Sequence, residues 1–175
     1  MVYLYVDRYE DSVQGSRRLL ERALLEQGYH NASLSHDEQG KPFLKNGLEI
    51  SISHTRDAAA VALSDSPVGV DLEYCRAVGT SVIRRVLSEE EQKWFRDRGA
   101  RREDFLALWT LKESYYKYLG TGLPGFPNQT EFYQEDGVWH LRGSALRFFV
   151  WQKDLLTAAL CCDEQEVEVN WGRQS

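Results

Sequence analysis

The chain has 175 residues, of which 42% are hydrophobic and 27% charged, with 13 glycines and 4 prolines. This size and composition predict one compact globular unit and exclude collagen-like and disordered chains. The net charge of −6 argues against nucleic-acid binding. No long apolar run or leader pattern follows Met1, so we expect a cytoplasmic protein that does not bind a membrane.

Helical and strand periodicities alternate irregularly along the chain, which predicts the α+β class rather than a regular βαβ fold. Ser88 and Glu91 have the spacing of a capping box, and Gly120 ends the longest helical pattern. The expected elements, in chain order, are a strand at 2–6, a helix at 16–27, strands at 48–53, 58–63 and 68–73, helices at 88–98 and 103–119, and strands at 138–142, 146–151, 155–161 and 166–171.

The strand expected at 68–73 places Asp71 and Glu73 on one face, because valine and leucine occupy the alternate positions. This face is either simply solvated or a pair of oxygen ligands for a hard cation such as Mg²⁺. On the longest helix, Trp109, Glu113 and Lys117 follow at steps of four and share one ridge. That ridge predicts either a weak surface salt bridge or the wall of a partly enclosed site.

Ser53 and His54 end another expected strand with two groups that can donate to a phosphate, although a lone histidine is more often structural. The chain has neither of the glycine-rich phosphate-binding loops, so a phosphate would be held by side chains and a metal ion. Together with the three carboxylates and the lysine, this pair indicates a Mg²⁺ site for phosphoryl-type chemistry.

Charge is distributed unevenly along the chain. Residues 1–75 hold 7 basic and 12 acidic side chains, residues 76–117 hold 10 and 7, and residues 118–175 hold 4 and 8. The basic segment is either an ordinary solvated helix surface or a face for an anionic partner. Most of its positive charge comes from Arg84, Arg85, Lys93, Arg96, Arg98, Arg101 and Arg102.

Four short segments resemble, in order and spacing, the motifs of the larger, surfactin-type branch of the 4′-phosphopantetheinyl transferases. Two of them match the GxD(x)E and W-x-x-K-E-[SA]-x-x-K signatures, and the other two match upstream motifs of this branch. The segments are 40–42 (GKP), 51–54 (SISH), 69–73 (GVDLE) and 109–117 (WTLKESYYK).

The resemblance implies transfer of 4′-phosphopantetheine from coenzyme A to a serine of an apo carrier protein of fatty-acid, polyketide or peptide synthesis, with release of adenosine 3′,5′-bisphosphate. It implies catalytic roles for Asp71, Glu113 and Lys117, with Glu113 as the base for the carrier serine. The implied ligands of Mg²⁺, or of Mn²⁺ in its place, are Asp71, Glu73 and Glu113. The implied ligands of the coenzyme A phosphates are Lys41, Ser53, His54 and Lys117, with Arg17 and Arg18 as further candidates.

The fold that the resemblance implies is a monomeric pseudo-dimer of two similar halves, each a helix packed on a small antiparallel sheet, with coenzyme A between them. The expected halves are residues 1–66 and residues 67–175, the second carrying the metal site. The first half is short for this branch, which we expect to affect coenzyme A affinity more than chemistry. For Lys112, also a motif residue, nothing beyond an ion pair is expected.

The implied partner is an acidic carrier protein, which we expect to dock near Arg84, Arg85, Lys93 and Arg96. Two alternatives remain open. A Mg²⁺-dependent hydrolase of nucleotide diphosphates would use the same carboxylates with water as the nucleophile. A degenerate relative would bind coenzyme A or a carrier protein without turnover.

Overall fold

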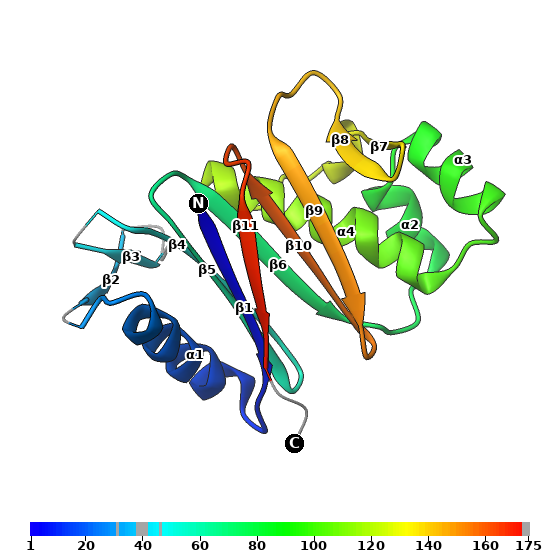
Figure 1. Ribbon diagram of the computed structural model, residues 1–175. Helices are drawn as coiled ribbons and strands as arrows, with labels where there is room; N and C mark the ends of the chain where they lie inside the picture. The colour runs from blue at the N-terminus through cyan, green and yellow to red at the C-terminus, as the bar shows by residue number, and fades with distance from the viewer. Residues whose placement is uncertain (31, 38–41, 46, 173–175) are drawn as a thin grey trace.

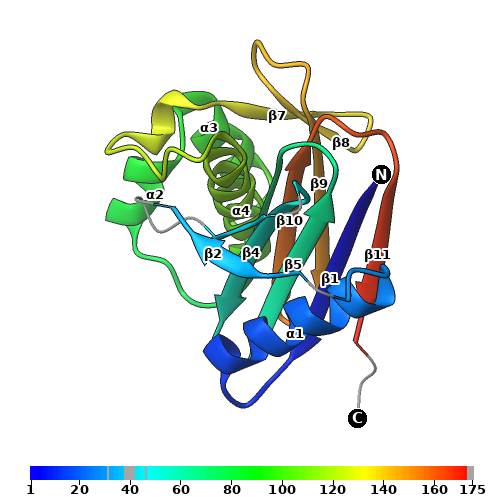
Figure 2. The same cartoon turned by 90° about the vertical axis from the view of Figure 1, so that its left-hand side faces the viewer.

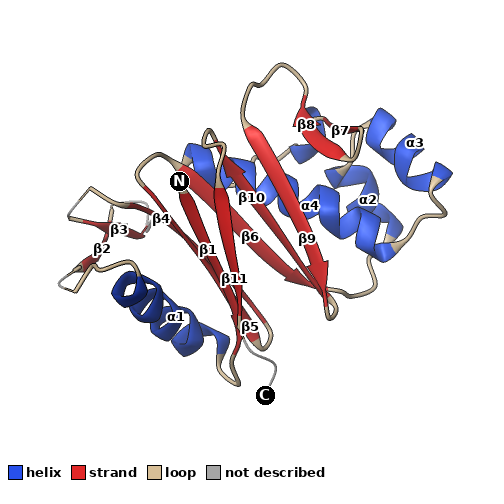
Figure 3. Ribbon diagram, viewed as in Figure 1, coloured by secondary structure: helices blue, strands red, loops and turns tan. Residues whose placement is uncertain are grey.

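The computed structural model describes residues 1–30, 32–37, 42–45 and 47–172. Strands lie at the centre of the molecule, and helices cover its two outer sides (Figure 1, Figure 3). In chain order the elements are β1 (Val2–Arg8), α1 (Ser12–Glu26), β2 (Leu34–His36), β3 (Pro42–Leu44), β4 (Glu49–Thr55), β5 (Ala58–Ser64), β6 (Val68–Tyr74), α2 (Thr80–Val86), α3 (Glu89–Asp97), α4 (Arg102–Leu119), the 3₁₀ helix η1 (Pro127–Gln129), β7 (Phe132–Glu135), β8 (Val138–Leu141), β9 (Arg147–Lys153), β10 (Leu156–Cys162) and β11 (Val167–Trp171).

The two main sheets repeat one topology. The first has the strand order β11-β1-β5-β4 and the second β6-β10-β9-β8-β7. In the first, β5 pairs antiparallel with both β1 and β4, and in the second β10 pairs in the same way with β6 and β9. This repeat confirms the predicted α+β class and the two similar halves, each a helix on a small sheet. One strand departs from the pattern: β11 pairs in parallel with β1 and so adds a C-terminal segment to the first sheet. The division between residues 66 and 67 stays a prediction.

The apolar core has three parts that correspond to the layers of the fold. One lies under α1, one lies under α4, and the third joins β1 and β5 to β6 and β10, between the two sheets. In the third part Ala58, Ala60 and Ala62 of β5 are fully buried, and their small side chains let the sheets approach closely. Figure 2 shows α1 and α4 on opposite sides of the strands.

Most element boundaries follow the local signals. Ser88 is the N-cap of α3 and forms the predicted capping box with Glu91, and Gly120 ends α4 in the left-handed conformation with φ 70°. The helix expected at 16–27 begins earlier, at Ser12, because the side chain of Asp11 caps it. The strands β2, β3 and β7 and the helix α2 were not expected. None of the described helices is both long and apolar enough to cross a lipid bilayer.

Candidate functional site

The long helix α4 packs on β6 and runs against the strand direction. Trp109 contacts Glu73 at one end of the strand, and Lys117 contacts Asp71 two residues earlier. Two residues of a strand advance ~6.8 Å and four residues of a helix advance ~6 Å, so alternate strand positions stay in step with successive helix turns. In this register Trp109 lies beside Glu73 and Glu113 beside Asp71, and Lys117, one helix turn further on, reaches back to Asp71.

Gly69 allows the close approach of α4 to β6. A Cβ atom built on Gly69 would overlap the carbonyl oxygen of Ser114 and the amide nitrogen of Tyr118, both in the backbone of α4. Helix backbone cannot yield as a flexible side chain can, so any larger residue would push α4 away from the strand. Gly69, the glycine of the GxD(x)E pattern, therefore sets the distance between β6 and the face of α4 that carries Glu113 and Lys117.

Asp71 is held by two donors on one of its oxygens. Its Oδ1 accepts hydrogen bonds from Lys117 Nζ at 2.8 Å and from Ser53 Oγ at 2.9 Å, and Lys117 Nζ also donates to Ser53 Oγ at 3.0 Å. The side chain is buried, and its Oδ2 has no hydrogen-bond partner among the described residues. Asp71 thus has one oxygen that accepts two hydrogen bonds and one that accepts none from the described residues. Asp71, Glu73 and Glu113 together form what we call the acidic patch.

The other two carboxylates lie nearby in a partly buried setting. Trp109 Nε1 donates to Glu73 Oε1 at 3.1 Å. Burial, and then the charge of Asp71, raise the pKa of Glu73, and the same two causes raise the pKa of Glu113 to about 7 from 4.5. Burial and the charge of Asp71 thus disfavour the ionised forms of Glu73 and Glu113 more than Lys117 offsets, and an added cation would favour the ionised forms.

A Mg²⁺ ion fits the chemistry of this donor set. Three carboxylates meet at one patch, and the buried Asp71 Oδ2 accepts no hydrogen bond from any residue that the structure describes. As the side chains stand, no three His, Cys, Asp or Glu residues of the described ranges lie close enough together to enclose a metal ion. Binding would therefore require Glu73 and Glu113 to turn toward Asp71.

The structure separates the residues expected to bind coenzyme A phosphates. Ser53 faces Asp71, whereas His54, on the other face of β4, is exposed and lies 3.5 Å from Ser12 Oγ at the start of α1. Arg17 and Arg18 are exposed on α1. Lys41 lies outside the described residues. Ser53 and His54 are therefore adjacent in sequence but do not converge on one point.

Lys112, for which only an ion pair was expected, is fully buried. Its Nζ lies 2.7 Å from Glu91 Oε2, donates to the carbonyl of Pro127 at 3.0 Å and also donates to the carbonyl of Thr130. These contacts connect α4 to α3 and to the segment around η1. Lys112 thus holds α4 in place from the side away from the carboxylates.

A cavity of about 340 Å³ opens beside the acidic patch, between α2 and α4. Glu73 and Trp109 line the end nearest the other carboxylates, and Arg76 adds a basic side chain to the lining. Its apolar lining includes Val78, Val82, Phe105 and Leu106. The sequence patterns gave no sign of this cavity, because α2 was not expected.

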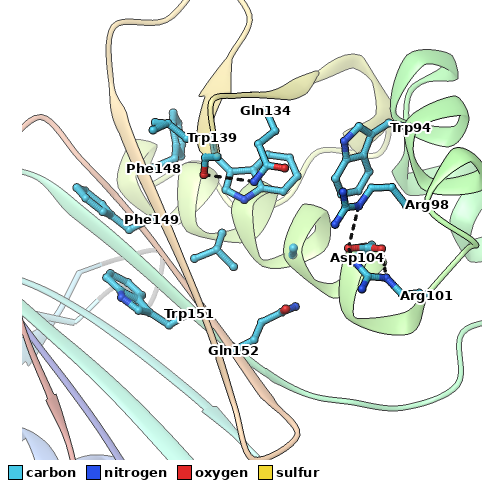
Figure 4. A pocket seen from close by; sticks show the side chains of 14 residues that line it. Trp94, Arg98, Arg101, Asp104, Gln134, Trp139, Phe148, Phe149, Trp151 and Gln152 are labelled. Carbon is cyan, nitrogen blue, oxygen red and sulfur yellow. Dashed lines mark hydrogen bonds and ion pairs between the residues drawn. The ribbon is translucent and has the colours of Figure 1, made fainter.

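A second cavity has a volume of about 410 Å³, and its lining residues, drawn in Figure 4, do not include Asp71, Glu73 or Glu113. Its lining comes from β9, from α3 and α4 with the segment between them, and from the β7–β8 hairpin. Arg98 and Arg101 both pair with Asp104 in its wall, and Arg98 stacks on Trp94. Arg98 and Arg101 of the basic segment are thereby partnered within the chain rather than grouped at the acidic patch.

The four residues expected at a docking surface are all exposed, but they lie on two helices. Arg84 and Arg85 occupy the last turn of α2, which borders the smaller cavity. Lys93 and Arg96 lie on α3, where Lys93 pairs with Asp97 at 2.9 Å.

Comparison with known proteins gives one consistent result. The model of the 4′-phosphopantetheinyl transferase superfamily matches residues 67–163. A 4′-phosphopantetheinyl transferase of Aneurinibacillus migulanus is 32% identical over 95 residues, which are 53% of this chain and 40% of that protein. Another, from Bacillus pumilus, is 28% identical over 149 residues, which are 78% of this chain and 64% of that protein.

The crystal structure of the holo-[acyl-carrier-protein] synthase of Thermotoga maritima matches with a TM-score of 0.47 and 29% identity, over 54% of this chain and 61% of that one. The chain spans 40% and 64% of the lengths of the two transferases. The family model covers more than half of the chain and includes both signatures, those around Asp71 and around Glu113. The chain therefore belongs to the 4′-phosphopantetheinyl transferase superfamily.

Proposed function

We propose that this protein transfers the 4′-phosphopantetheine group of coenzyme A to a serine of an apo carrier protein and releases adenosine 3′,5′-bisphosphate. The observation that carries the proposal is the register of α4 on β6, which brings Asp71, Glu113 and Lys117 together in one partly buried patch. Membership of the superfamily supports the same reaction.

In this reaction the serine Oγ attacks the phosphorus atom that bears the pantetheine arm. The bond from that phosphorus to the bridging oxygen breaks, the bisphosphate leaves, and the serine proton passes to a base. Glu113 is the candidate base, since its carboxylate lies next to Asp71 on the ridge that faces β6. Lys117 carries the positive charge closest to Asp71 and would stabilise the leaving phosphate oxygens. Bound Mg²⁺, held by Asp71, Glu73 and Glu113, would neutralise and orient the diphosphate.

The cavity between α2 and α4 suits the pantetheine arm. It begins at Glu73 and Trp109, beside the patch where the diphosphate would bind, and its remaining lining is mostly apolar. An arm placed there would have its methyl groups against Phe105 and Leu106 and would leave the phosphorus at the carboxylates.

An acidic carrier protein would dock most effectively on α2. Arg84 and Arg85 are exposed in the last turn of this helix, and Val82 of the same helix lines the cavity. A carrier bound there would hold its serine close to the mouth of the site. On α3, Lys93 is already neutralised by Asp97, so we expect α3 to contribute less to docking.

Mass spectrometry of an apo carrier protein after incubation with this protein, coenzyme A and Mg²⁺ tests the proposal. We expect a mass gain of one phosphopantetheine, which is lost in Asp71→Ala and Glu113→Ala. Glu135→Ala, which removes an exposed carboxylate on β7, is the matched control and should retain full activity. Absence of any gain with fatty-acid, polyketide and peptide carriers would contradict the proposal. Release of bisphosphate without a carrier would identify a hydrolase instead.

A further inference from the structure

The two sheets meet where β4 lies beside β6, and serine hydroxyls join the two strands there. Ser51 Oγ accepts a hydrogen bond from the amide of Val70 at 2.9 Å, and Ser53 Oγ accepts one from the amide of Leu72 at 3.1 Å. Both amides lie on the edge of β6 that faces away from its partner β10, since β6 is the outer strand of its sheet. Ser51 and Ser53 therefore play the same role for β6, since each accepts a hydrogen bond from one of its backbone amides.

Ser53 has two further contacts that Ser51 lacks. Its hydroxyl donates to Asp71 Oδ1 at 2.9 Å and accepts from Lys117 Nζ at 3.0 Å. A serine hydroxyl has one proton to donate and two lone pairs to accept with. The amide of Leu72 and the ammonium of Lys117 occupy both lone pairs, and Asp71 takes the proton. No hydrogen-bonding capacity is left for a phosphate oxygen.

We propose that Ser53 is a positioning residue, which fixes the carboxylate of Asp71 and the ammonium of Lys117 and does not bind a phosphate of coenzyme A. This inference rests on the proposed function, since it assigns how the carboxylate of the same site is oriented. Ser53 and Lys117 together occupy Asp71 Oδ1, which leaves the buried Oδ2 as the oxygen available to a cation. The hydroxyl thus connects the contact between the two sheets to the carboxylate on which the site depends.

The position of the neighbouring residue supports this assignment. His54 points to the opposite face of β4, where it is exposed and lies near Ser12 of α1. A phosphate held by His54 on that face would be on the wrong side of the strand for Ser53. The two residues therefore have separate roles although they are adjacent in sequence.

Ser51→Ala is a matched control for Ser53→Ala, because each variant removes one hydroxyl that accepts a β6 amide. We expect both to lower the midpoint of urea unfolding, and Ser53→Ala to lower it further because it also removes the hydrogen bond to the buried Asp71. We expect only Ser53→Ala to weaken metal binding at the acidic patch. Ser53→Thr keeps the hydroxyl and should recover most of what Ser53→Ala loses.

Binding of Mn²⁺, followed by electron paramagnetic resonance with coenzyme A present, is the readout that a purely structural role would not move. Loss of a hydrogen bond to a metal-ligating carboxylate typically weakens metal binding about 10- to 100-fold. We expect a loss in this range for Ser53→Ala and less than a threefold change for Ser51→Ala. Equal Mn²⁺ affinities in the two variants would overturn the proposal.

A comparison of coenzyme A with 3′-dephospho-coenzyme A separates positioning from phosphate binding. If Ser53 does not bind the 3′-phosphate, the ratio of the affinities for the two compounds in EDTA will be the same in wild type and Ser53→Ala. A ratio that falls toward one in Ser53→Ala would make Ser53 a phosphate ligand and refute the proposal.

The outcomes for the wild type distinguish this inference from the proposed function. A wild-type protein that binds Mn²⁺ and coenzyme A but modifies no carrier would contradict the transfer reaction and leave the role of Ser53 standing. A wild-type protein that binds no Mn²⁺ with coenzyme A present would overturn the role of Ser53 at a metal site.

Discussion

Replacement of Lys112 by methionine tests whether this motif residue stabilises the fold rather than the reaction. Lys112 is 0% exposed and its partner Glu91 is 2% exposed, so their ion pair is shielded from water. Methionine keeps most of the apolar stem and removes the ammonium. Glu91 would retain hydrogen bonds from the amides of Ser88 and Phe132, but its charge would have no counter-charge, and the carbonyl of Pro127 would lose its donor.

Removal of one partner of a buried ion pair costs about 3–5 kcal/mol. The two amide donors that remain on Glu91 place Lys112→Met at the lower end, about 3 kcal/mol. For a chain of this length each kcal/mol lowers Tm by roughly 2–4 °C, so Tm should fall by about 6–12 °C. Urea unfolding followed by circular dichroism measures the free energy directly.

Lys93→Met is the matched control, because Lys93 is 66% exposed and pairs with Asp97 at the surface. It should change the free energy of unfolding by less than about 0.5 kcal/mol. Glu91→Gln should lower the free energy of unfolding less in the Lys112→Met background than in the wild type. In that background it removes a charge that Lys112→Met has left without a counter-charge. The reasoning is refuted if Lys112→Met destabilises the protein no more than Lys93→Met.

Three further predictions concern the packing of α4, the acidic patch and the docking surface. Gly69→Ala should destabilise the protein by about 1–3 kcal/mol by forcing α4 away from β6 and abolish carrier modification, whereas Gly125→Ala, with open space around it, should change neither in urea unfolding and mass spectrometry. Because burial and Asp71 raise the pKa of Glu113 to about 7, the folded chain holds a proton that the unfolded chain releases between pH 4.5 and 7. Stability in EDTA should therefore fall by about 1–2 kcal/mol from pH 5 to pH 7.5, after discounting for solvent screening, and Glu113→Gln should remove most of this slope. Reversal of charge in Arg84→Glu/Arg85→Glu should raise the carrier KM about tenfold at low salt and flatten its salt dependence, whereas Lys93→Glu/Arg96→Glu should have a smaller effect; equal effects would remove α2 as the main docking helix.

Local periodicity was sufficient to predict the parts of the site that lie on regular elements. The alternation along β6 placed Asp71 and Glu73 on one face, and the step of four along α4 placed Glu113 and Lys117 on one ridge. The helix α2 could not be predicted in the same way. It has only seven residues, and its N-cap is Gly79, which has no side chain to cap the helix. The cavity that α2 borders was therefore not expected either.

Ser53 and His54 are adjacent in β4, and their opposite orientations are predictable from the sequence. The same period of two that put Asp71 and Glu73 on one face of a strand puts two adjacent residues on opposite faces. The opposite orientation of His54 thus follows from its position in β4 alone. The hydrogen bonds that Ser53 makes to Asp71 and Lys117 did not follow, because they depend on how two separate sheets meet.

Lys112 and Glu113 are neighbours in sequence, and the helix turns about 100° between them. Glu113 consequently faces the acidic residues of β6, while Lys112 faces Glu91 of α3 and the carbonyl of Pro127. The position of α4 is therefore set from two sides, by Gly69 under the helix and by Lys112 beside it. The contact at Gly69 involves backbone only and has no substitute, whereas the contact at Lys112 is one ion pair among many packing contacts. A change at Gly69 should thus displace the ridge and lower activity directly, while a change at Lys112 should lower stability first and leave kcat of the folded fraction within tenfold of wild type.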